Sequence, residues 1–144
     1  MRALAFVLLI AAPAALAAPV PKELRKSDLH RLAGTWANTG SCTGGVVIAP
    51  PDGSNWRFDT EGKAAILNAG QPPKEGIRFV LDSTTEPKSF DWIAPWGSWY
   101  GVYELKDNTF TIYLNSLGIE KRNRQAAVGP GVQMYSFKRS EPGK

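Results

Sequence analysis

The side chains that most often carry catalysis are scarce in this sequence. His30 is the single histidine and Cys42 the single cysteine, so we expect neither a catalytic triad nor a zinc site built from several imidazoles. A nucleophilic cysteine needs a neighbouring base, and His30 precedes the predicted strands. We therefore predict a protein that is not an enzyme and has no cofactor and no metal. Cys42 is interpreted as a small strand or loop side chain, with a reactive thiol or an intermolecular bridge as the alternatives.

Three acidic residues lie close together in the sequence. Asp82, Glu86 and Asp91 could supply oxygen ligands to a hard cation. They flank a proline turn, however, and acids around a turn are typical of a solvated loop. We favour the loop interpretation.

Aromatic residues form the most unusual feature. Three tryptophans and a tyrosine fall within the nine residues from Trp92 to Tyr100, around Pro95 and Gly97. Strand alternation predicts that Trp92 and Trp99 face inward, whereas Trp96 lies in a connection and Tyr100 points the other way. Trp96 and Tyr100 are therefore candidates for surface recognition, because exposed aromatic side chains stack on sugars, apolar ligands or protein partners. The alternative is that Trp96 folds back as a plug over one end of the domain.

Short alternating strands must position these residues. After Ser27 or Asp28, which can cap a short helix carrying Leu29 and Leu32, the sequence changes at Thr35 to alternating apolar and polar residues. Turn residues separate the runs, and Asp107-Asn108 is typical of a two-residue hairpin. The predicted strands are 35–39, 44–49, 55–60, 63–68, 76–82, 88–94, 99–106, 109–115 and 132–139.

The alternation also predicts one apolar face. Side chains such as Phe79, Phe90 and Phe110 share it with their neighbours two residues away, and polar residues occupy the other face. Because there is too little helix to cover this face, the sheet must close on itself. The predicted fold is all-β: an up-and-down antiparallel β-barrel of about eight strands with a short N-terminal helix.

The first residues have the pattern of a signal peptide. Arg2 precedes an apolar run, Pro13 and a small-residue site near Ala17, and the run is too short and interrupted for a membrane anchor. We predict a signal peptide at 1–17, a linker at 18–26 and a β-barrel domain at 27–141. The protein is expected to be exported to the periplasm or outside the cell, without insertion into the membrane. The formal charge of +4 is not clustered, so we expect no nucleic-acid partner.

Two places in the chain resemble lipocalins. The segment from Leu29 to Trp36 looks like a short helix that enters a strand through Gly34-Thr35-Trp36, as in the lipocalin opening. The resemblance implies a lipocalin-like barrel in which Trp36 closes one end and Arg139, near the end of the last strand, packs across its indole ring.

A closer resemblance is to a lipocalin-like family of small uncharacterised exported bacterial proteins, of the planctomycete type, that open with Leu-x-Gly-Thr-Trp. Stretches around Leu81–Asp91, Gly101–Ile112 and Phe137–Arg139 are similar in order and spacing, but residues 120–128 depart from the family pattern. The family implies a fold and an exported location, and no established reaction or ligand comes with it.

These observations favour a ligand-binding barrel. We expect one small apolar molecule to bind among inward aromatic side chains, while no protein partner can be named. The alternative is a structural module, or one that binds a protein or a glycan, with a filled core and an exposed aromatic rim. A cavity of roughly 300 Å³ or more would favour the ligand. The predicted ligand-binding residues are Trp36, Phe79, Phe90, Trp92, Tyr103, Phe110 and Tyr135.

Overall fold

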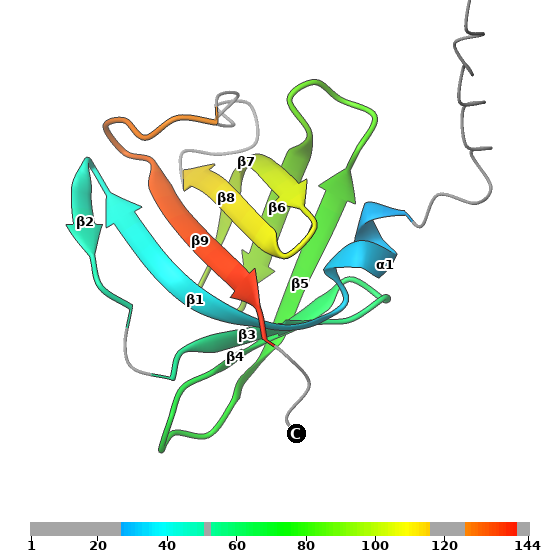
Figure 1. The fold of residues 1–144 in the computed structure, drawn as a ribbon, viewed down its shortest axis with the longest axis vertical. Helices are drawn as coiled ribbons and strands as arrows, with labels where there is room; N and C mark the ends of the chain where they lie inside the picture. Colours follow the sequence, from blue (N-terminus) through cyan, green and yellow to red (C-terminus); the bar gives the residue numbers. More distant parts are fainter. Residues whose placement is uncertain (1–26, 51–52, 116–125, 141–144) are drawn as a thin grey trace, which may run out of the picture.

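The computed structural model describes residues 27–50, 53–115 and 126–140. The predicted signal peptide and linker lie outside the described residues, as do the end of the predicted domain at 141 and most of the stretch that departs from the family pattern. Within the described residues, a short helix stands beside one antiparallel sheet that curves into a barrel (Figure 1).

The helix α1 (Asp28–Leu32) forms where its capping residue predicts it. The Oγ atom of Ser27 accepts a hydrogen bond from the backbone N–H of His30 at 3.4 Å, which satisfies one of the free donors of the first turn. Leu32 is fully buried and anchors the helix against the barrel. No helix in the described ranges has the length and hydropathy that a membrane crossing requires.

In the part of the chain that the structure describes, nine strands follow the helix, close to the predicted ranges. The main difference lies at the start, where the first strand continues through an irregularity at Asn38–Gly40. The predicted strand 44–49 is correspondingly shorter, because Gly44 and Gly45 both adopt positive φ angles and form the turn. The strands are β1 (Gly34–Thr43), β2 (Val46–Ile48), β3 (Asn55–Phe58), β4 (Lys63–Leu67), β5 (Lys74–Asp82), β6 (Ser89–Ala94), β7 (Gly97–Lys106), β8 (Thr109–Asn115) and β9 (Gln133–Arg139).

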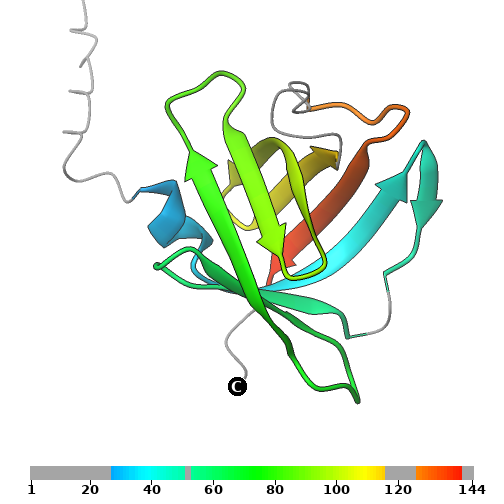
Figure 2. The same ribbon diagram turned by 180° about the vertical axis from the view of Figure 1, so that it is seen from behind.

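Pairing between the first and last strands closes the barrel. From β3 to β9 each strand pairs with the next, β1 pairs with β3, and β9 returns to pair with β1 (Figures 1 and 2). The closed circuit therefore has eight strands, and β2 pairs only with the far half of β1. The prediction of an up-and-down antiparallel barrel of about eight strands is confirmed.

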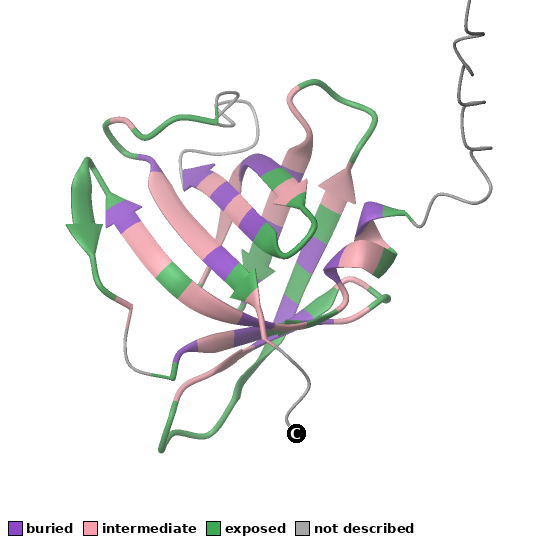
Figure 3. Ribbon diagram, viewed as in Figure 1, coloured by how far each residue is buried: buried purple, intermediate pink, exposed green. Residues whose placement is uncertain are grey.

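Burial alternates along the strands as the period of two requires (Figure 3). Phe79, Phe90 and Phe110 are all buried, which confirms the predicted apolar face. Not every strand follows this pattern: Val46, Val47 and Ile48 of β2 are all exposed, and β4 and β7 have consecutive buried residues.

The two ends of the barrel are built differently. We call the end covered by α1 the closed end; the β5–β6 and β7–β8 connections also lie there (Figures 1 and 2). We call the opposite end, where the β1–β2 and β6–β7 turns lie, the open end.

Candidate functional site

Aromatic rings pack together in the interior of the barrel. Phe110 lies near the centre, with its ring centroid 5.9 Å from Trp36, 5.6 Å from Phe58 and 5.9 Å from Phe90. Phe79 packs edge-on against Phe58 at 5.2 Å. Centroid distances in this range are those of directly packed aromatic pairs, so these rings form a solid core.

A small cavity remains above this core at the open end. Its volume is about 100 Å³. Trp56 forms part of its wall, with its ring centroid 4.6 Å from Trp92 and 5.2 Å from Tyr135. The lining residues are Trp56, Ile66, Trp92, Trp96, Trp99, Leu114, Gln133 and Tyr135.

The β6–β7 hairpin supplies three of the four tryptophans. Trp92 and Trp99 are cross-strand partners on its inner face, and the hairpin turns at Pro95 and Trp96. Gly97 has a φ of 154°, and a Cβ atom there would lie 3.0 Å from the Trp99 ring. A side chain at this position would therefore displace Trp99. Glycine permits the tight turn that holds Trp96 beside the cavity.

Trp96 is at once a cavity wall and a surface residue. Its side chain is 53% exposed, whereas Trp56 and Trp92 are 6% and 4% exposed. The prediction that Trp96 is exposed is confirmed, and its position beside the cavity also agrees with the idea of a partial cover. Tyr100 is half-buried opposite Asp91 on the outer face of the hairpin, so it does not share a surface with the cavity.

The cavity has one polar edge. Tyr135 Oη donates a hydrogen bond to Gln133 Oε1 at 3.3 Å, which leaves the amide nitrogen of Gln133 as a donor beside the cavity. Burial raises the pKa of Tyr135, so its hydroxyl stays protonated at neutral pH and can donate this bond.

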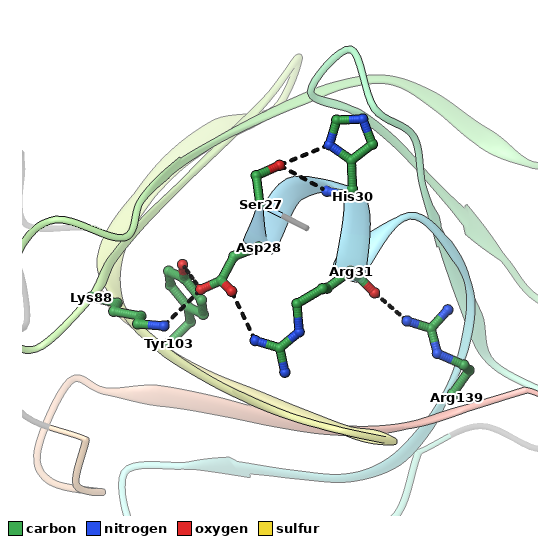
Figure 4. A network of polar contacts seen from close by, with 7 residues as sticks. All are labelled: Ser27, Asp28, His30, Arg31, Lys88, Tyr103 and Arg139. Carbon is green, nitrogen blue, oxygen red and sulfur yellow. Dashed lines mark hydrogen bonds and ion pairs between the residues drawn. The ribbon is translucent and has the colours of Figure 1, made fainter. Parts of the chain in front are cut away.

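The closed end contains a partly buried polar network (Figure 4). Asp28, at the start of α1, accepts hydrogen bonds at 2.8 Å from Lys88 Nζ and from Tyr103 Oη, and at 3.0 Å from an Arg31 nitrogen. Burial tends to raise the pKa of Asp28. The bonds from Lys88 and Tyr103, with the charges of Lys88 and Arg31, outweigh this effect and lower the pKa below its ordinary value. The carboxylate therefore ties the helix to Lys88, directly before β6, and to β7.

Trp36 and Arg139 complete the closed end. Trp36 is fully buried and donates its indole N–H to the carbonyl of Leu32 at 2.7 Å. The Arg139 guanidinium carbon lies 4.4 Å from the centroid of the Trp36 ring. The guanidinium donates to the backbone carbonyl of Ala33 and to that of Arg31 (Figure 4). This is the arrangement that the lipocalin resemblance implied for the pair.

Of the seven predicted ligand-binding residues, two line the cavity. Trp92 and Tyr135 are there, whereas Trp36, Phe79, Phe90, Tyr103 and Phe110 fill the barrel beneath it or at the closed end. The lining residues that the prediction did not include are Trp56, Ile66, Trp99, Leu114 and Gln133. Strand alternation around the polar Arg57 could also have placed Trp56 on the inner face. For Trp99, the same argument from alternation did predict an inward side chain.

The residues considered for chemistry are separate from one another. Cys42 is a free thiol, buried within β1, which confirms its interpretation as a strand side chain. Asp82 Oδ1 accepts hydrogen bonds from the backbone and hydroxyl of Thr84, as expected of a loop acid. In the part of the chain that the structure describes, no three metal-ligating side chains of His, Cys, Asp or Glu come together.

The chain matches no model of a known protein family, no curated protein and no solved structure. The fold class accordingly rests on the observed strand pairing, and the lipocalin-like family stays a prediction.

Proposed function

We propose that this protein is a binding protein whose site is the open-end cavity, and that the ligand inserts one small apolar group there. The observation that carries the proposal is the lining: four tryptophans and Tyr135 surround a cavity that continues to the exposed ring of Trp96. Aromatic walls with a few polar groups are typical of small-molecule sites.

The volume determines how much of a ligand can enter. Sites that enclose a whole drug-sized ligand measure about 300–1,000 Å³, and an apolar cavity of about 150 Å³ holds benzene. A cavity of about 100 Å³ therefore accepts a short hydrocarbon chain or, with small adjustments of Trp96, a single ring. The rest of the ligand would lie outside, over Trp96. The volume is below the roughly 300 Å³ expected for an enclosed ligand, so the site is shallower than the interior one expected from the sequence.

The polar edge adds a preference. The Gln133 amide can donate to a carbonyl or hydroxyl oxygen at the point where the inserted group meets the remainder of the ligand. We expect molecules with an apolar end next to such an oxygen to bind better than pure hydrocarbons.

Nuclear magnetic resonance of the indole N–H groups tests the proposal. Titration with benzyl alcohol and with hexanol should shift the signals of Trp56, Trp92, Trp96 and Trp99. The Trp36 signal, from the closed end, should stay in place and serves as the internal control. Absence of shifts up to the solubility limit of both compounds would contradict the proposal.

Two variants locate the site. Ile66→Phe should fill the cavity and abolish the shifts, and Trp96→Ala should weaken binding by removing one wall. Val80→Ala is the matched control, since Val80 is a 50% exposed apolar residue on β5 that does not line the cavity. Equal loss of binding in all three variants would indicate non-specific association.

A second candidate function follows from the exposure of Trp96. A ring that is 53% exposed above a largely filled barrel is also suited to stacking on a protein or glycan partner. Native mass spectrometry of protein purified from its own host separates the two functions. Extra mass from a small apolar molecule, lost on denaturation, supports the cavity ligand. A complex with a glycan or a protein, without such a small molecule, supports the second candidate.

A further inference from the structure

A second hollow lies on the outer wall of the barrel, away from the aromatic cavity. Its volume is about 430 Å³, and it spans β3, β4 and β5. Arg57, Ala65 and Arg78 alternate with inward-facing buried residues on their strands, so their side chains point to the outer face. The hollow is thus a groove on the outside of the sheet.

An irregularity in β5 creates the groove. Ala64 pairs with Ile77 but Ile66 pairs with Lys74, so β5 has one extra residue opposite Ala65. Gly76, in this bulge, has a φ of 78°, which glycine adopts without strain. Bulges bend a strand and re-aim its side chains. The small side chain of Ala65, only 5% exposed, forms the floor.

Cations border this floor on both sides. Arg57 on β3 is the cross-strand partner of Ala65, while Arg78 on β5 is paired directly with Lys63 on β4. Like charges in directly opposed positions destabilise a sheet, so the pairing of Lys63 with Arg78 has a cost within the fold. A bound anion would offset it.

Among the described residues, no carboxylate forms an ion pair with either arginine. Lys63 forms an ion pair with Glu61 at 2.5 Å, but among the described residues neither Arg57 nor Arg78 makes an ion pair or a side-chain hydrogen bond. Their strands lie two spacings of about 4.8 Å apart, a separation that two long side chains can bridge through one bound oxyanion.

The acidic side chains near the groove limit the kind of anion. Asp59 Oδ1 already accepts the backbone N–H groups of Glu61 and Lys63 at 2.8 Å each. Glu75, in the bulge, lies on the same wall as Arg78. A carboxylate there repels a second negative charge and accepts hydrogen bonds from hydroxyl or ammonium groups.

We propose that this groove binds a ligand with a single oxyanion group, a carboxylate, phosphate or sulfate ester, and with hydroxyl or ammonium donors elsewhere. Arg57 and Arg78 hold the oxyanion through charge-assisted hydrogen bonds, the carbon skeleton lies over Ala65, and Glu75 accepts from the donors. The site is independent of the aromatic cavity.

Binding of glucuronate, inorganic phosphate and sulfate, each titrated at a fixed ionic strength of about 0.1 M, tests the proposal. At least one probe should bind and shift the backbone amide signals of Ala65 and Gly76, and the probe that binds tells which oxyanion is preferred. No shift of these amides with any probe would overturn the proposal.

Variants distinguish specific binding by the two arginines from general attraction of anions to a basic protein. The double variant Arg57→Gln with Arg78→Gln should weaken binding about tenfold or more, and it should fold at least as well as the parent because the like-charge pair is removed. Lys138→Gln, on the outer face of β9, should leave affinity unchanged, as should Trp96→Ala. Equal weakening by Lys138→Gln would overturn the proposal in favour of non-specific attraction to a basic protein.

Discussion

The two ends of the barrel bury similar kinds of side chain but use them differently. At the closed end, the indole of Trp36 has a hydrogen-bond partner, a cation over its face and no exposed surface. At the open end, Trp96 is 53% exposed beside a cavity. A tryptophan that is fully partnered stabilises the fold, whereas one left half in solvent is available for recognition. The difference separates an end whose tryptophan stabilises the fold from the end where the binding site is proposed.

The strongest test of this division is Trp36→Ala. Removing a fully buried indole together with its bond to Leu32 and its contact with Arg139 should lower the free energy of unfolding by about 3–5 kcal/mol. Urea unfolding followed by circular dichroism measures it. If the alanine variant does not fold, Trp36→Phe should show a smaller loss. If Trp36→Ala lowers the free energy of unfolding no more than Trp96→Ala does, the two ends do not differ in their contribution to stability.

Asp28→Asn should have the next largest effect. It removes the charge that Lys88 and Arg31 face and weakens the three hydrogen bonds that the carboxylate accepts, and we expect the free energy of unfolding to fall by about 2 kcal/mol. Glu104→Gln, an exposed carboxylate on β7, is the matched control and should change stability by less than about 0.5 kcal/mol. Equal effects of the two substitutions would mean that the Asp28 network contributes no more than a surface charge.

The pH dependence sharpens the same point. Because the pKa of Asp28 is lower in the folded protein than its ordinary value of 3.8, the folded state binds this proton less readily than the unfolded state. The ionised Asp28 carboxylate therefore contributes its full stabilisation of the fold at pH values above 3.8. This contribution is lost as the pH falls through the lower pKa of the folded state. Unfolding measured from pH 6 to pH 2 should show a shallower acid loss for Asp28→Asn than for the parent. Identical slopes would contradict the assignment.

Tyr103→Phe should cost less, about 1 kcal/mol. The ring stays in the core and only the hydroxyl that donates to Asp28 at 2.8 Å is lost. Tyr113→Phe, on β8, is the comparison for removal of a tyrosine hydroxyl outside the Asp28 network. Thermal unfolding of the two variants measures the difference, and a larger loss for Tyr113→Phe would argue against the closed-end network as the stabilising element.

The smallest effect on stability is expected for Trp96→Ala. Because half of this ring is already in solvent, its removal should change the free energy of unfolding by about 1 kcal/mol or less, while ligand-induced shifts at Trp92 and Trp99 diminish. Urea unfolding and the indole titration measure the two effects on one sample. A large destabilisation would show that Trp96 is a plug rather than a recognition residue.

The fold could be predicted from the sequence because its signals are local. Alternation assigns each side chain to a face, and turn residues such as Asp107-Asn108 end the strands. Gly44-Gly45, which were predicted within a strand, form a turn instead. The cavity could not be predicted in the same way, since alternation gives the face but not the depth along the barrel. Phe90 and Trp92 both face inward, two residues apart, yet only Trp92 reaches the cavity.

Depth depends on strand register, which arises from pairing between distant segments. Trp56, on β3, meets Trp92 on β6 and Tyr135 on β9, and no local pattern connects these three positions. The groove on the outer wall was missed for a related reason: it depends on the extra residue of β5 opposite Ala65, which becomes visible only when β4 and β5 are aligned.

The pairing of β1 with β9 also affects when the protein can fold. Arg139 meets the carbonyl of Ala33 across 106 residues of sequence, so the barrel cannot close until nearly the whole domain has been synthesised. Contacts this distant in the chain form slowly. Late closure is compatible with the export leader predicted at 1–17, because a chain whose first and last strands have not yet paired would still be open enough to cross a membrane.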